Sequence, residues 1–216
     1  MLLDKLAIKH KADKSSLYHN FAEKYDALLA GFRASFVNVL EIGVAQGQSL
    51  RMWADYFPNA AIHGADIEPS FRSCESYSSR IKFHVIDQGN EAQLNTLKPF
   101  APFDLIIDDG NHWWREQIVS FKALFPLLKP GGIYIVEDSC TSYWSEYNNN
   151  PITCVDYFKG LVDEVNLNGA RGRIPVNPAP DFGWDKGWQR REDCHTLPEF
   201  DSIQFMNAII VIHKRP

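Results

Sequence analysis

Cysteine is scarce in this sequence, and its spacing forms no known motif. The 216 residues include Cys74, Cys140, Cys154 and Cys194, and no two of them make a C-x-x-C pair. Such spacing indicates neither a zinc site nor a disulfide framework. We therefore expect reduced thiols in a cytoplasmic protein.

Long apolar runs and clusters of basic residues are also missing. No window approaches the roughly 20 apolar residues that a transmembrane helix needs. The N-terminus is too short and too charged for the apolar region of a signal peptide. The formal net charge is −5, and no basic cluster stands out. We therefore expect neither a membrane nor a nucleic acid as a partner.

The glycine motif of dinucleotide-binding proteins, G-x-G-x-x-G, is absent as well. Instead, a β-branched run at 36–42 leads into Gly43 and Gly47, spaced G-x-x-x-G, before a predicted helix at 49–56. Glycine lets a ligand approach the backbone closely, and exposed N–H groups at a helix start bind polar ligand atoms. The pattern indicates a nucleotide-type site and disfavours an NAD-dependent dehydrogenase. Asp66 ends the next predicted strand, where an acid can accept hydrogen bonds from ribose hydroxyls.

Strand and helix patterns alternate through most of the chain. Strands are predicted at 36–42, 60–66, 80–87, 103–108 and 132–138. Helices are predicted at 17–32, 49–56, 91–97, 116–128 and 153–165. This alternation predicts a doubly wound, mostly parallel α/β sheet. Two final runs, 201–206 and 208–213, predict an antiparallel hairpin at one edge, which completes a seven-stranded Rossmann-like sheet.

We expect residues 1–216 to form a single domain. Residues 1–33 are predicted to be an N-terminal helical cover, with Ser15 and Ser16 as the N-cap of its helix. Residues 139–199 are predicted to be an insertion that serves as a lid or binds the acceptor substrate. Its part at 168–199 is rich in Gly, Pro and Trp and lacks periodicity, and such long loops are usually lids or binding loops.

Carboxylates follow two of the predicted strands at the point where each strand ends. Asp108 and Asp109 follow one apolar run, and Glu137 and Asp138 follow the next. In open parallel sheets, ligands bind outside the carboxyl ends of the strands. Mg²⁺ prefers oxygen ligands, and three carboxylates in one crevice would repel each other without a cation. We therefore predict that Asp109, Glu137 and Asp138 bind Mg²⁺ or a similar divalent cation.

His112 lies three residues beyond Asp109 and can overhang the same crevice. A neutral imidazole near pH 7 suits a general base. We predict that His112 is the catalytic base.

Several motifs resemble those of the class I S-adenosylmethionine-dependent methyltransferases. They are residues 41–47 (EIGVAQG), Asp66, residues 128–132 (LKPGG) and the terminal hairpin. The resemblance narrows to the metal-dependent macrolide-sugar and rhamnosyl O-methyltransferases of the mycinamicin type through residues 13–20 (DKSSLYHN), 108–112 (DDGNH), 136–138 (VED) and 141–144 (TSYW). Asn111 departs from the serine that is usual in this family.

The resemblance implies a class I methyltransferase fold, with S-adenosylmethionine as the cofactor and a metal held by the same three carboxylates. The cofactor-binding residues that we expect are Glu41, Gly43, Gly47, Ser49, Asp66, Asp87, Gln88 and Asp108. Among these, Asp87 and Gln88 are expected at the adenine, and Asp108 is expected to support the site as a neighbour or helix cap. The acceptor would be a hydroxyl of a sugar or of a glycosylated natural product. A catechol-type or other small-molecule acceptor stays open as the alternative, and the family suggests self-association.

Overall fold

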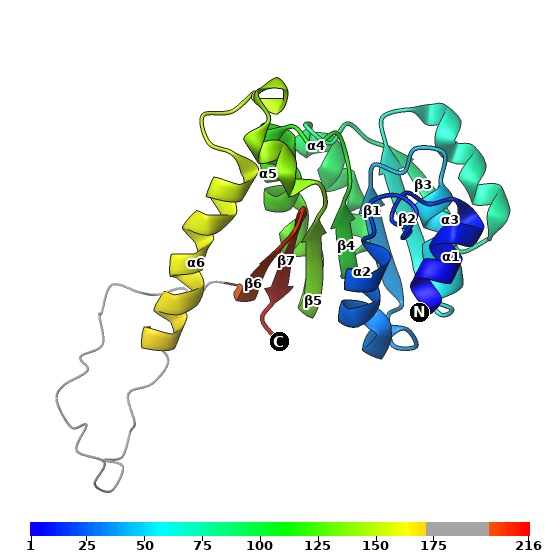
Figure 1. The fold of residues 1–216 in the computed structure, drawn as a ribbon, viewed down its shortest axis with the longest axis horizontal. Coiled ribbons are helices and arrows are strands. Elements are labelled where there is room, and N and C mark those ends of the chain that lie inside the picture. Colours follow the sequence, from blue (N-terminus) through cyan, green and yellow to red (C-terminus); the bar gives the residue numbers. More distant parts are fainter. Residues whose placement is uncertain (172–198) are drawn as a thin grey trace, which may run out of the picture.

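A computed structural model describes residues 1–171 and 199–216 of the chain. Its centre is one seven-stranded sheet with the order β3-β2-β1-β4-β5-β7-β6, and helices lie on both faces (Figure 1). The strands are β1 (Asn38–Ile42), β2 (Ala61–Asp66), β3 (Ile81–Val85), β4 (Phe103–Asp108), β5 (Leu128–Val136), β6 (Phe200–Met206) and β7 (Ile209–Lys214). The predicted α/β fold with a C-terminal hairpin is confirmed.

The helices alternate with the strands as the sequence pattern predicts. They are α1 (Leu2–His10), α2 (Ala22–Leu29), α3 (Gln48–Tyr56), α4 (Glu91–Leu94), α5 (Trp114–Leu124) and α6 (Cys154–Arg171). Short 3-10 helices are η1 (Ala30–Phe32), η2 (Pro69–Tyr77), η3 (Asn95–Phe100), η4 (Phe125–Leu127), η5 (Ser139–Tyr143) and η6 (Ser145–Tyr147). None of the described helices is long and apolar enough to cross a membrane.

The strand order reverses between β1 and β4: β2 and β3 follow on one side of β1, whereas β4 and β5 lie on its other side. Strand β1 pairs in parallel with both β2 and β4, and β4 pairs in parallel with β5. Strands β5, β7 and β6 then pair antiparallel. A reversal of this kind leaves a crevice at the carboxyl ends of the strands. Gly43, just after β1, and Asp109, just after β4, therefore lie at its mouth.

The central strands of the sheet are buried on both faces, and their alternate residues belong to different cores. One core joins strand residues such as Val39 and Ile107 to α1, α2 and α3. The other joins Leu40 and Ile106 to α5 and α6. All six residues of β4 are buried, which explains why its apolar run is continuous rather than alternating.

The N-terminal cover differs from its prediction. The helix predicted at 17–32 begins later, as α2, and a further helix, α1, precedes it. The predicted cap Ser16 is not the N-cap of α2. Its backbone N–H and its hydroxyl both donate to Asp4 of α1, at 2.7 and 3.0 Å. Helix α1 ends at His10 and is capped by Lys11, which has a left-handed φ of 58°, and α2 begins only at Ala22.

Helix α6 is longer than predicted. It runs to Arg171 rather than ending near 165. Of the predicted loop at 168–199, residues 172–198 lie outside the described part of the chain, so the loop stays a prediction.

Candidate active site

The ends of β4 and β5 bring the predicted acidic residues to one place. Asp108 pairs with Val136 across the two parallel strands, and the Glu137 N–H donates to the Asp108 carbonyl at 2.9 Å. Asp109 N–H in turn donates to the carbonyl of Ile42, the last residue of β1, at 2.9 Å. The backbone therefore anchors Asp109 between the glycine turn and the end of β5.

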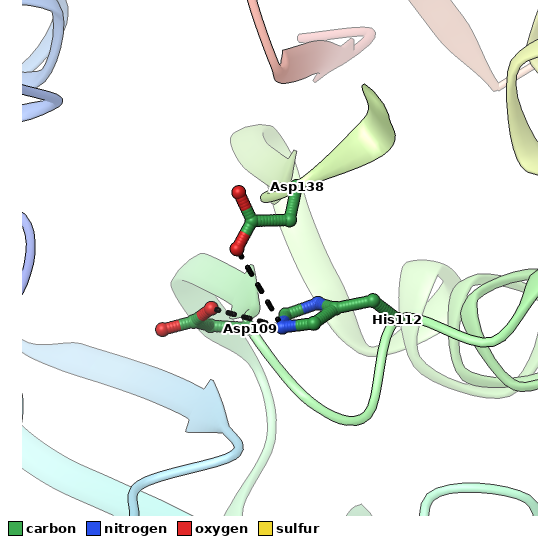
Figure 2. A group of neighbouring side chains, drawn as sticks. All are labelled: Asp109, His112 and Asp138. Carbon is green, nitrogen blue, oxygen red and sulfur yellow. Dashed lines mark ion pairs between the residues drawn. The ribbon is translucent and has the colours of Figure 1, made fainter. Parts of the chain in front are cut away.

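Asp109, His112 and Asp138 form one group, with the imidazole directed toward the two carboxylates (Figure 2). One ligand atom from each lies within 4.8 Å of the others. His112 Nε2 is 3.5 Å from Asp138 Oδ2 and 4.0 Å from Asp109 Oδ1. His112 and Asp138 both have a positive φ, 60° and 50°, a strained conformation that clusters at functional sites. The two carboxylates of this group fit a hard divalent cation, which prefers oxygen ligands, and the imidazole lies beside them.

Glu137 points away from that group. It is buried, and its Oε1 accepts a hydrogen bond of 2.5 Å from the Tyr25 hydroxyl. Glu137 joins Glu41 and Asp109 in a second group of close carboxylates. The three predicted metal ligands are therefore divided between two groups that share Asp109, because the backbone after β5 turns at Asp138, which has a left-handed φ of 50°.

The buried group has a counter-ion that the sequence pattern does not reveal. The Lys14 ammonium lies 2.5 Å from Asp109 Oδ2, 3.1 Å from Glu137 Oε1 and 3.4 Å from Glu41 Oε1, and its side chain is 1% exposed. The repulsion argument for a metal therefore loses its force for these three carboxylates, since Lys14 supplies a cation. The periodicity of residues 13–20 contains no signal for a buried lysine; the one signal was the resemblance of this run to the family.

Burial dominates the protonation of this cluster. It raises the pKa of Glu41 to about 7, although Lys14 lowers it. It raises the pKa of Glu137 well above the usual range, and the charge of Asp109 adds to the effect. It also raises the pKa of Asp109. Burial lowers the pKa of Lys14, but the surrounding carboxylates outweigh it and raise that pKa well above its usual value, so the ammonium stays charged.

The glycine turn after β1 separates two cavities. One of about 190 Å³ is lined by Ile42, Gly43, Ala65, Asp66, Ile67, Ile86, Asp87, Gln88, Gly110 and Asn111. The other, of about 200 Å³, is lined by Lys11, Asp13, Gly43, Val44, Ala45, Gln48, Ser49 and Asp109. Gly43 lies in both, with a φ of 78°, and a Cβ there would stand 1.9 Å from the Asp109 carbonyl oxygen. The turn and the Asp109 loop are therefore in direct contact.

The predicted cofactor residues are placed in two ways. Asp66 and Asp87 line the first cavity, and backbone N–H groups hold both carboxylates: Val44 and Ala45 donate to Asp66, and Gly89 donates to Asp87. Ser49 lines the second cavity. These side chains have both the position and the rigidity that a polar ligand needs.

The other predicted residues stand behind the cavities. The Glu41 carboxylate accepts from Ser49 Oγ at 2.6 Å and from Trp53 Nε1 at 3.2 Å, so it braces the start of α3. Gly47 caps that helix with a φ of 79°, and a Cβ on it would collide with Cys74. Both residues therefore support the glycine turn through the start of α3, and neither lines the two cavities.

Asp108 and Gln88 form a buried network under the loop that carries His112. Gln88 Nε2 donates to Asp108 Oδ1 at 2.5 Å, while its Oε1 accepts from the Asn111 N–H at 3.0 Å. Ser120 and Tyr134 also donate to Asp108. Burial raises the pKa of Asp108 to about 7. Gln88 therefore lines the first cavity, but its side-chain amide is hydrogen-bonded to Asp108 and to the loop that carries His112.

A family model described as "Methyltransferase domain" matches residues 40–139. The chain is 39% identical over 173 residues to 8-demethyl-8-alpha-L-rhamnosyl tetracenomycin-C 2'-O-methyltransferase of Streptomyces olivaceus, covering 74% of this chain and 45% of the relative. It is 36% identical over 178 residues to L-olivosyl-oleandolide 3-O-methyltransferase of Streptomyces antibioticus, covering 76% and 46%.

Solved structures show the same fold. The MycE methyltransferase from the mycinamycin biosynthetic pathway, in complex with Mg, SAH and mycinamycin VI, superposes with a TM-score of 0.79 at 27% identity, covering 100% of this chain and 54% of that one. The chain thus spans about half the length of the curated relatives that it matches.

Proposed function

We propose that this protein, which has a methyltransferase domain at residues 40–139 and the class I methyltransferase fold, transfers a methyl group from S-adenosylmethionine to a sugar hydroxyl with the help of a divalent cation. One observation carries the proposal: the glycine turn after β1 touches the backbone of Asp109. A cofactor held at that turn and a hydroxyl held beside Asp109 would therefore be neighbours.

The chain's own residues supply alignment. The Asp66 and Asp87 carboxylates, fixed by backbone N–H groups, are suited to ribose and adenine polar atoms in the first cavity. Gly43 and Ser49 are suited to the amino-acid part in the second. Glu41, Gly47, Gln88 and Asp108 support this site from behind. Holding two reactants in line can supply about 7–11 kcal/mol of the barrier reduction.

His112 is suited to remove the hydroxyl proton. Its Nε2 lies close to the carboxylates of both Asp109 and Asp138 (Figure 2). The nearby Asp138 carboxylate stabilises the imidazolium that forms when Nε2 takes a proton. A positioned base of this kind contributes about 10²–10⁴ in rate.

A divalent cation would be held by Asp109 and Asp138, with Glu137 behind them. When bound, such a cation would lower the pKa of an acceptor hydroxyl and help to fix its position. The relatives' names support a sugar acceptor, because they describe enzymes that act on rhamnosyl and olivosyl groups. The MycE complex, which contains Mg and SAH, supports both cofactors.

We further propose that residues 1–216 work as a single methyltransferase domain, with 1–33 as a helical cover and 139–199 as the acceptor-binding insertion. Exposed aromatic side chains support this role for the insertion: Trp113, which follows His112 in the sequence, and Trp144 both pack against Tyr147. Trp114, in contrast, is buried and donates to the Thr141 carbonyl. The composition supports a cytoplasmic location, and the resemblance supports self-association.

The proposal is tested with a panel of acceptors and S-adenosylmethionine, with the products identified by mass spectrometry. We expect methylation of rhamnosyl and olivosyl glycosides, its loss in EDTA and its return with Mg²⁺. Methylation of catechols alone would favour the catechol-type alternative, and turnover undiminished in EDTA would remove the metal from the mechanism.

A matched pair of variants tests the acidic site. Asp138→Asn should lower turnover about 100-fold while the affinity for S-adenosylhomocysteine stays unchanged. Asp156→Asn, an exposed position on α6, is the control and should leave both unchanged. Equal turnover of the two variants would contradict the role of Asp138.

A further inference from the structure

We propose that Lys14 is a positioning residue of the metal site: by holding one carboxylate oxygen of Asp109, it fixes the other on the side of His112 and Asp138. The inference rests on the proposed function and extends it to a residue of the N-terminal cover. It assigns to that cover a direct part in building the active centre.

The two oxygens of Asp109 have different partners. Oδ2 accepts a hydrogen bond of 2.5 Å from the Lys14 ammonium. Oδ1 faces His112 Nε2 at 4.0 Å, in the group that also contains Asp138. Because the carboxylate is planar, holding Oδ2 sets the direction of Oδ1. The same ammonium lies 3.1 Å from Glu137 Oε1, so it restrains a residue from each of the two strand ends.

The backbone that carries the Lys14 side chain is held by hydrogen bonds. The Lys14 carbonyl accepts from the Ala22 N–H at 2.8 Å. Just beyond it, the Ser15 carbonyl accepts from the Asn20 N–H at 2.9 Å, and the Asp13 carbonyl accepts from the His19 N–H at 3.0 Å. A hydrogen-bonded turn, rather than a loose terminus, therefore presents the side chain. Groups that orient metal ligands in this way typically affect metal affinity by about 10–100-fold.

Lys14 could instead serve only to balance the charge of the buried carboxylates. The variant Lys14→Arg distinguishes this charge-balancing role from the positioning role. An ammonium is a compact donor that holds one oxygen, whereas a guanidinium tends to grip both oxygens of a carboxylate. Arginine therefore preserves the charge but would turn Asp109 Oδ1 away from His112. Positioning predicts that Lys14→Arg does not restore metal binding, and charge balance predicts that it does.

The experiment measures Mn²⁺ affinity by electron paramagnetic resonance in the presence of saturating S-adenosylhomocysteine. Lys14→Met, of similar length and without charge, should weaken Mn²⁺ binding about 10–100-fold. Lys5→Met, an exposed lysine on α1, removes the same charge and should bind Mn²⁺ like the wild type. Calorimetry with S-adenosylhomocysteine and urea unfolding of each variant show whether the fold and the cofactor site remain.

Two results would overturn the inference. One is a folded Lys14→Met that binds Mn²⁺ as tightly as the wild type or more tightly. The other is a Lys14→Arg with wild-type Mn²⁺ affinity, and this second variant decides the matter if Lys14→Met does not fold. A wild-type protein that binds neither Mn²⁺ nor Mg²⁺ would instead remove the metal from the proposed function itself, which keeps the two failures apart.

Discussion

Replacing Gly43 by alanine should disturb the glycine turn and the metal site together. The φ of 78° costs an L-residue about 1–2 kcal/mol. The new Cβ would also lie 1.9 Å from the Asp109 carbonyl oxygen, where real Cβ atoms keep at least 3.0 Å. The Asp109 backbone must therefore move by about 1 Å, at a further cost of about 1–3 kcal/mol. We expect a total loss of about 2–5 kcal/mol in the free energy of unfolding.

Gly131 provides the matched control for this prediction. Its φ is 73°, but no atom lies within 4 Å of the place that a Cβ would take there, so Gly131→Ala should lose only the conformational part, about 1–2 kcal/mol. Urea unfolding gives both values. A misplacement of about 1 Å at a reacting centre can cost about 100-fold in rate, so Gly43→Ala should also lose turnover and affinity for S-adenosylhomocysteine, whereas Gly131→Ala should keep both. Equal stability and equal cofactor affinity of the two variants would refute the contact between the turn and the Asp109 loop.

Three further predictions concern histidines and one surface carboxylate. His112→Asn, chosen because asparagine tolerates a positive φ, should lower turnover at least about 100-fold with cofactor affinity unchanged; near-normal turnover would exclude it as the base. Burial and then His84 lower the pKa of His63 to about 4, so the folded state binds fewer protons than the unfolded one, and stability should fall by about 2 kcal/mol as the pH drops from 6.5 to 4; His63→Phe should flatten that dependence in urea titrations. Despite partial burial, hydrogen bonds that begin with the one from Lys9 lower the pKa of Asp55 to about 2. Asp55→Asn should therefore cost about 1 kcal/mol at pH 7 and progressively less as the pH falls from about 5 towards 2, and a loss that is undiminished at pH 2 would contradict the ion-pair explanation.

Local pattern was sufficient for the sheet. The apolar run at 105–107 followed by two aspartates predicts a buried strand, and β4 confirms both the strand and its burial. The meeting of Asp109 with the residues after β5 follows from the same logic, since neighbouring parallel strands end at one edge.

The direction of individual side chains could not be predicted in this way. Glu137 and Asp138 are adjacent in sequence, yet one is buried beside Tyr25 and the other faces His112. The backbone turn at Asp138, with its φ of 50°, decides this. Lys14 was missed for a different reason: its partners Glu41, Asp109 and Glu137 lie far along the chain, and no periodic pattern reports contacts over such separations.

The N-terminal cover also has a consequence for the order in which the molecule can fold. Lys14 meets Asp109 across 95 positions of sequence, Tyr25 meets Glu137 across 112, and Lys24 donates to the Asn207 carbonyl across 183. Residues of the N-terminal cover can therefore dock only after most of the chain that follows them has been synthesised. Contacts between distant residues carry a large loop-closure entropy and slow folding. The active centre should consequently be the last region to become ordered during synthesis, after the parallel strands beneath it have paired.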